Sequence, residues 1–288
     1  MPSLKTIRQK IESIKSTRQV TSAMKMVSAA KLQRAQQAIL NARPYADELD
    51  EILLSFASRT PDYLHPLLRR VGPEEVQTIG LIVVTADKGL CGAFNLNIIK
   101  AAESIIQKYK DKKIELICVG KKGWKHFSKA GYPIREKYLE FFDKLEFHHS
   151  SDIMKLVVSS FLAREYDKVI IVYNEFKSAL QQRIVERQLL PFETQETEEK
   201  PLPPYILEPD SVTLLEELIK KHLDVQIWRI LLESSSAEQG ARMTAMDSAT
   251  DNADELIEEL TISYNRKRQE NITTAIIEVA SAAEAMKG

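Results

Sequence analysis

The chain has 288 residues, with 40 Lys and Arg against 41 Asp and Glu, and a formal net charge of −1. This balance is not the strongly basic one of a typical nucleic-acid-binding domain. Two cysteines are too few for a disulfide framework and favour a reducing cytosol. The longest apolar run, Ile79 to Val84, has the length of a strand and is far short of a membrane span.

The N-terminal region predicts one long helix. Neither proline nor glycine occurs between Ser3 and Arg43. The first apolar side chains have the 3-4-3 spacing of a coiled-coil seam; they are Leu4, Ile7, Ile11 and Ile14. Nine Lys or Arg lie in this region, against Glu12 alone.

The seam then falters, because Arg18 and Lys25 occupy positions that a regular coiled coil fills with apolar residues. A second stripe is expected to take over, formed by Val20, Met24 and Val27. A seam that changes position along the helix predicts a helix pair that is not a regular, uniform coiled coil. Lys25, at a position that favours an apolar side chain, is expected to face an external partner.

The middle of the chain alternates strand and helix signals. Strands are expected at Thr78–Thr85, Ile114–Val119, Lys168–Tyr173 and Gln182–Leu190, the last antiparallel to its predecessor. Helices are expected at Phe94–Tyr109, Gly123–Ala130 and Ser151–Arg164. This alternation predicts a Rossmann-like α/β domain with a mostly parallel sheet.

A glycine-containing loop, Thr85 to Asn95, follows the first strand, where α/β folds bind phosphates. Its spacing fits neither GxGxxG nor GxxxxGK[ST], so a structural turn or a contact loop for a partner is favoured over nucleotide binding. No histidine lies near Cys91 in sequence to act as its base. His148 and His149 have no further ligands that complete a metal set. The sequence therefore predicts no active site, cofactor or metal.

The C-terminal region predicts a second long helix, from Ser211 to Lys287, interrupted only by Gly240. Small residues dominate Ser234 to Ala253. Two apolar stripes follow: Leu256, Leu260 and Tyr264, then Ile272, Ile276, Val279, Ala283 and Met286. The segment Asp247 to Glu259 carries six acidic residues and no basic one, so it should attract the basic N-terminal helix. An antiparallel coiled coil follows, with the tip of the longer C-terminal helix continuing alone.

Four segments are thus expected: an N-terminal coiled-coil helix (1–59), an α/β domain (74–192), a linker (193–210) and a C-terminal coiled-coil helix (211–288). The two uninterrupted stretches would measure roughly 60 and 115 Å at the helical rise. A domain of this size is only about 30 to 40 Å across. We therefore expect a stalk that reaches into a partner or transmits force to it.

Four motifs in order resemble the gamma subunit of F-type ATP synthases. The run Gln19 to Lys31 is similar to that family's first helix, and Asp87 to Asn95 to its DRGLCGGFN loop, with Lys88 for Arg and Ala93 for Gly. Tyr205–Asp210 is similar to the stretch before its last helix, and Ala237–Ala253 with Tyr264–Thr273 to that helix. Ala275 and Ala282 stand where the family usually has an acidic residue and a glycine. The regulatory cysteine insertion of the chloroplast form is absent, so no thiol regulation is expected.

The resemblance implies a central rotor stalk without catalytic residues of its own, driven by proton or sodium flow. Its implied partners are the ring of three alpha and three beta subunits, the epsilon subunit and the membrane ring of c subunits. Its implied location is peripheral, at the cytoplasmic face of a bacterial inner membrane. The residues implied to contact beta are Met24, Lys25, Arg268 and Gln269. The stripe Ile272, Ile276, Val279, Ala283 and Met286 is the implied bearing tip, and Tyr205 and Glu208 are implied contacts of epsilon or the c-ring.

Two other functions fit parts of the sequence. One is a nucleotide-dependent α/β enzyme whose basic helical arm binds RNA; the missing phosphate motif and the acidic second helix of the arm count against it. The other is a plain coiled-coil adaptor.

Overall fold

The computed structural model describes residues 3–59, 67, 72, 74–192 and 211–286. The chain forms two compact units: Met1–Val27 with Met243–Gly288, called here the helical unit, and Ser28–Arg242, called the α/β unit. The predicted segments follow the secondary-structure elements, whereas these units divide the two long helices. The predicted linker, 193–210, lies outside the described residues.

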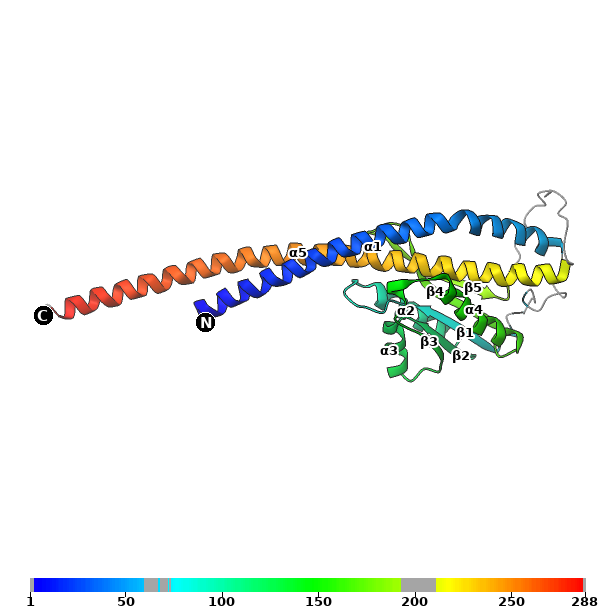
Figure 1. The fold of residues 1–288 in the computed structure, drawn as a ribbon. Coiled ribbons are helices and arrows are strands. Elements are labelled where there is room, and N and C mark those ends of the chain that lie inside the picture. Colours follow the sequence, from blue (N-terminus) through cyan, green and yellow to red (C-terminus); the bar gives the residue numbers. More distant parts are fainter. Residues whose placement is uncertain (1–2, 60–66, 68–71, 73, 193–210, 287–288) are drawn as a thin grey trace. The chain divides into compact units, whose positions relative to one another are not determined.

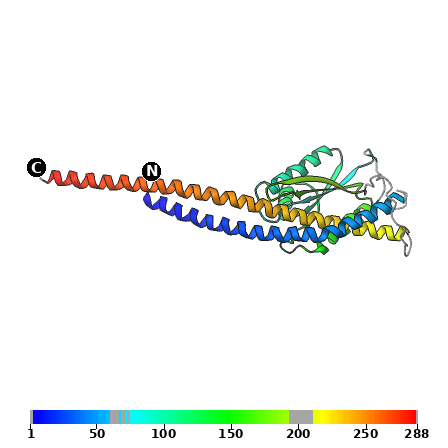
Figure 2. The same ribbon diagram turned by 90° about the horizontal axis from the view of Figure 1, so that it is seen from above.

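The helical unit is an antiparallel pair formed by the start of α1 (Leu4–Arg59) and the end of α5 (Ser211–Ala285). Arg18 pairs with Asp254, and Lys25, further along α1, pairs with the earlier Asp247 of α5. Because positions rise along one helix as they fall along the other, the two run in opposite directions. Figure 2 shows them side by side, with α5 continuing past the beginning of α1.

The seam of this pair keeps one register, and the predicted second stripe is wrong. Ile7 is buried at the start. Further along, Thr21 is buried and its hydroxyl lies 2.8 Å from that of Thr250, whereas Val20 and Val27 are 55% and 57% exposed. The seam stays in place because its polar side chains have partners on the facing helix.

The facing side of α5 also differs from the prediction in one place. Leu256 is 46% exposed, and Ile257 is half-buried instead. Ala253, Ile257, Leu260 and Tyr264 therefore continue the heptad spacing on the side towards α1.

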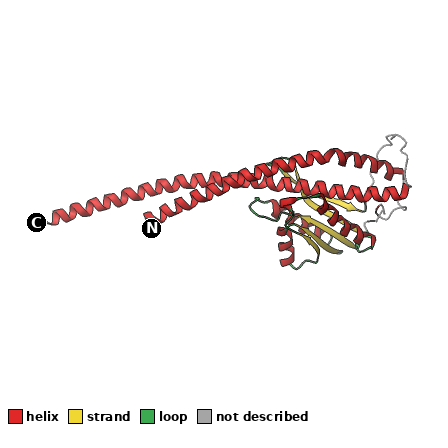
Figure 3. Ribbon diagram, viewed as in Figure 1, coloured by secondary structure: helices red, strands yellow, loops and turns green. Residues whose placement is uncertain are grey.

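The α/β unit contains a five-stranded sheet of order β3-β2-β1-β4-β5 (Figures 1 and 3). The first four strands in this order are parallel and β5 is antiparallel to β4, which confirms the mostly parallel prediction. The elements are β1 (Thr78–Val84), α2 (Phe94–Lys108), β2 (Lys113–Val119), α3 (Lys121–Lys129), β3 (Ile134–Tyr138), the 3₁₀ turn η3 (Phe142–Lys144), α4 (Phe147–Leu162), β4 (Lys168–Phe176) and β5 (Gln182–Leu190).

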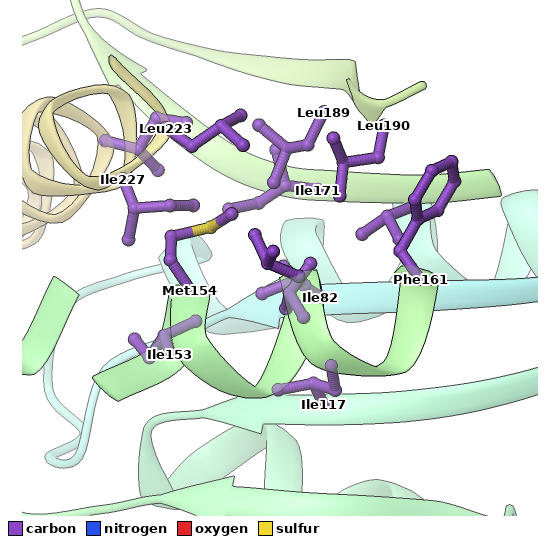
Figure 4. Packing of buried hydrophobic residues seen from close by; sticks show 14 of the residues in the cluster. Ile82, Ile117, Ile153, Met154, Phe161, Ile171, Leu189, Leu190, Leu223 and Ile227 are labelled. Atoms are coloured by element: carbon purple, nitrogen blue, oxygen red, sulfur yellow. The ribbon is translucent and has the colours of Figure 1, made fainter. Parts of the chain in front are cut away.

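Buried side chains pack on both faces of the sheet. On one face, Ile82 and Ile171 pack with α4 and α5; Figure 4 shows Leu223 and Ile227 of α5 beside Met154 of α4. On the other face, the alternate residues of the strands pack with α2 and α3. Because α5 supplies part of the core, its first half belongs to the α/β unit.

Candidate partner-binding site

The glycine-containing loop between β1 and α2 is held closed by its own side chains. The side-chain oxygen of Asn95 accepts a hydrogen bond from Ala86 N at 2.9 Å, and its amide nitrogen donates to the carbonyl of Lys88 at 3.4 Å. Leu90 and Gly92 adopt positive φ values of 60° and 56°. A loop filled by its own asparagine is a structural turn, as the sequence favours.

Both thiols lie in the core. Cys91 is 1% exposed, and burial raises its pKa. Burial also raises the pKa of Cys118, to about 12. A thiol that stays protonated at neutral pH is a poor nucleophile, which agrees with the expectation that Cys91 performs no covalent chemistry.

The sequence pattern suggested that Lys25 faces an external partner. In the structure it also faces the neighbouring helix. Its ammonium pairs with Asp247 on the facing helix, while its side chain stays 43% exposed. Met24 beside it is half-buried. The predicted attraction between the basic N-terminal helix and the acidic segment of α5 is therefore present at Arg18 and Lys25, which leaves fewer cations for an RNA backbone.

Arg268 and Gln269 lie on α5 with exposed side chains. Their neighbours Arg266 and Lys267 both pair with Glu270, at 3.5 and 2.9 Å. The hydrogen bond from Lys267 lowers the pKa of Glu270 below its ordinary value. Within the described part of the chain, no side-chain hydrogen bond or ion pair engages Arg268 or Gln269.

The predicted bearing tip is exposed on all sides. Every residue from 268 to 286 is exposed, including Ile276, Val279 and Met286 at 63%, 70% and 90%. This part of α5 thus presents apolar side chains without a facing helix among the described residues. Tyr205 and Glu208, the implied contacts of epsilon or the c-ring, lie outside the described residues.

One open hollow of about 300 Å³ was not anticipated from the sequence. It lies between α1, α4 and α5 and is lined by Ala42, Tyr45, Phe147, Lys221, Val225 and Trp228. Across the described ranges there is no group of three or more His, Cys, Asp or Glu placed to hold a metal ion. None of the described helices combines the length and apolarity that a membrane span needs.

Solved structures define the class of this fold. The chain superimposes on a chain of the Euglena gracilis mitochondrial ATP synthase (OSCP/F1/c-ring, rotational state 3) with a TM-score of 0.70 and 21% identity, covering 98% of this chain and 94% of that one. A chain of the Tetrahymena thermophila mitochondrial ATP synthase (central stalk/c-ring) matches with a TM-score of 0.62 and 24% identity, covering 80% and 99%. The fold is that of an ATP synthase central stalk.

Sequence comparison gives the family. The sequence pattern of the ATP synthase family matches residues 3–286. Two proteins named ATP synthase gamma chain, from Chlorobium phaeobacteroides (strain BS1) and Chlorobaculum parvum, are 46% and 47% identical over the full length of both chains. The chain belongs to the ATP synthase gamma chain family, and is thus a non-catalytic stalk subunit. Nothing in these comparisons supports the nucleotide-dependent enzyme with an RNA-binding arm.

Proposed function

We propose that this chain is the rotor that couples ion-driven turning of the c-ring to the conformational cycle of the catalytic beta subunits. The observation that carries this proposal is α5, whose exposed apolar tip continues a helix pair while its first half fills the core of the α/β unit. One continuous helix would thus join the α/β unit, which the c-ring would turn, to the exposed tip of α5, which would turn inside the ring of alpha and beta subunits. α5 contains no proline over its 75 residues and should resist bending, which suits a transmission element.

The proposed partners follow from the family. The helical unit would stand inside the ring of alpha and beta subunits, and the α/β unit would contact epsilon and the c-ring. The similar solved structures come from a central stalk/c-ring assembly and from an OSCP/F1/c-ring assembly. The complex would place this chain peripherally at the cytoplasmic face of a bacterial inner membrane, driven by protons or sodium ions.

Arg268 and Gln269 are the proposed polar contacts with beta. A guanidinium offers a fork of donors that suits a carboxylate, and the amide adds one donor and one acceptor. Glu270 pairs with Arg266 and Lys267 and not with Arg268 or Gln269. Their exposure leaves both available to a partner.

The function is tested by purifying the chain and measuring ATP hydrolysis alone and after assembly with alpha and beta subunits. We expect no hydrolysis by the chain alone and a rotation-dependent ATPase in the assembly. Hydrolysis by the purified chain would instead support an enzyme, and an assembly whose activity is indifferent to this chain would support a mere adaptor.

Met24 and Lys25 are proposed to face beta as well, and the ion pair with Asp247 allows a sharp test. Lys25→Glu places two carboxylates opposite each other and should cost up to about 1 kcal/mol of stability, because exposed pairs are weak. The swap Lys25→Glu with Asp247→Lys restores the pair within the chain. We expect it to restore the melting temperature but not the turnover of the assembled enzyme. Full recovery of turnover would mean that Lys25 serves only Asp247.

A further inference from the structure

A buried ion pair on α5 holds the glycine-containing loop. Arg242 Nη2 donates to the carbonyl oxygen of Gly89 at 3.1 Å and pairs with Glu238 Oε1 at 2.7 Å. The side chains of Arg242 and Glu238 are only 8% and 6% exposed. Burial raises the pKa of the Glu238 carboxyl, and Arg242 opposes that rise. Desolvating two charges is costly and is rarely a gain in stability, so this pair calls for another explanation.

A second charge cluster binds the same loop to the other long helix. Asp143, in the turn η3, accepts from Lys31 Nζ of α1 at 2.8 Å and from Lys88 Nζ of the loop at 2.6 Å. The hydrogen bonds from Lys31 and Lys88 lower the pKa of Asp143 to about 2. One carboxylate thus joins α1 to the loop, one residue before the carbonyl that Arg242 holds.

Both attachments lie where the α/β unit ends. This unit begins at Ser28 on α1 and ends at Arg242 on α5. Lys31 is about one helical turn from the first boundary. Gly240 of α5 lies within one helical turn of Arg242. A Cβ added at Gly240 would lie 3.3 Å from Ala179, in the turn between β4 and β5. Within the α/β unit, α1 and α5 are therefore both held near the residues at which this unit ends.

We propose that Lys31, Lys88, Gly89, Asp143, Glu238 and Arg242 form a torque joint within the α/β unit, where they fix the parts of α1 and α5 that belong to this unit to its glycine-containing loop. The proposal rests on the rotor function given above. Apolar contacts are not directional and resist sliding poorly. Charge-assisted hydrogen bonds have a preferred direction, and here they converge on a loop that is closed by Asn95. Turning force on the sheet of this unit then reaches its own parts of α1 and α5 through directional bonds.

The test uses the complete ATP synthase in proteoliposomes and compares ions pumped per ATP hydrolysed, with and without an opposing ion gradient. The variant Glu238→Gln with Arg242→Met removes both buried charges together, so neither is left unpaired. Against the gradient, we expect its ratio to fall by about threefold or more, as for the loss of one or two directional bonds. Without the gradient, the ratio should stay near that of the wild type.

The matched control is Arg229→Met with Glu233→Gln. These residues form an ion pair of the same i,i+4 spacing on α5, at 3.1 Å, and their hydrogen bond joins them to each other. A fall in the loaded ratio no larger than that of the control would overturn the proposal. An equal fall of the ratio with and without the gradient would also overturn the proposal, because general destabilisation of the subunit would lower the ratio in both conditions.

A surface variant decides the matter if the buried variant does not assemble. Asp143→Asn weakens the attachment of α1 at an exposed site and should lower the loaded ratio, whereas Asp152→Asn, at an exposed position of α4, should not. Equal ratios for these two variants would refute the joint. Failure of the rotor function itself would look different, because even the wild-type assembly would then pump no ions.

Discussion

Single residues determine how the loops at the ends of β1 and β2 fit together. Gly120 has a φ of +93°, and a Cβ there would lie 2.0 Å from the carbonyl oxygen of Thr85. The hydroxyl of Thr85 in turn accepts a hydrogen bond from Gly123 N at 2.9 Å. Asp87 also accepts from the backbone of Lys121. The two loops are therefore joined by contacts that admit no side chain at residue 120.

Gly120→Ala should destabilise the α/β unit by more than about 3 kcal/mol, because backbone strain and a direct clash with a carbonyl combine. Gly131→Ala is the matched control: its φ is +79°, but nothing lies within 4 Å of an added Cβ. It should cost only the left-handed strain, about 1 to 2 kcal/mol. Urea unfolding of both variants measures the difference, and equal losses would show that the clash at Gly120 is relieved by movement.

The Asp143 cluster should make stability depend on pH in acid. Its carboxyl has a folded-state pKa of about 2, below the ordinary value of about 3.9. The unfolded chain therefore binds a proton first, and the stabilisation, complete at neutral pH, is lost as the pH falls from about 4 towards 2. Asp143→Asn lacks this contribution. Its stability deficit in urea titrations should shrink between pH 5 and pH 2.5, and a deficit that is constant with pH would contradict the assignment.

The elements show which sequence signals are sufficient and which are not. β1, β2 and β4 are predicted correctly because continuous apolar runs mark strands buried on both faces. β3 was missed: its sequence, Ile-Arg-Glu-Lys-Tyr, has three charged residues and forms an edge of the sheet, where one side can remain in water. α4 begins at Phe147 rather than Ser151, because His149 accepts a hydrogen bond from Glu146 N and starts the helix earlier.

The helix pair contains one well-buried apolar residue near its beginning that can be tested. Ile7 is 4% exposed in the seam, whereas Ile277, on the tip of α5, is 58% exposed. Ile7→Ala should destabilise the pair by about 2 to 4 kcal/mol through lost burial and a cavity. Ile277→Ala should change stability by less than about 0.5 kcal/mol. Thermal melts followed by far-ultraviolet circular dichroism compare the two, and similar effects would argue against the antiparallel seam.

At the scale of the whole molecule, family membership follows from sequence motifs, but the torque joint does not. Lys31, Asp143 and Arg242 are more than ninety positions apart in sequence, and no local pattern connects them. A helical Glu-x-x-x-Arg spacing is common on solvated surfaces, so burial of the Glu238–Arg242 pair becomes visible only when the fold brings the loop against α5. The second apolar stripe of α1 was predicted wrongly for the same reason, because polar residues such as Thr21 have partners on a helix that is distant in sequence.

Arg268→Ala with Gln269→Ala should affect only the assembled enzyme. Both side chains are exposed, so the melting temperature of the free chain should change by no more than about 2 °C. Loss of a charge-assisted contact made in part of the rotary cycle should lower ATP hydrolysis and synthesis several-fold. The control is Arg266→Ala, which removes a cation that pairs with Glu270. Wild-type turnover in the double variant would eliminate the proposed contact.

The unequal lengths of the two helices should affect how readily the unassembled subunit is degraded. The last part of α5, residues 268–285, continues past the beginning of α1, and its side chains are exposed (Figure 2). A lone helix of about this length is marginal in water, because nucleation is costly and packing is absent. Its amide protons should exchange rapidly in the free chain, and proteases should trim it first. A cell could thereby remove orphan copies while sparing those whose tip is enclosed by its partners.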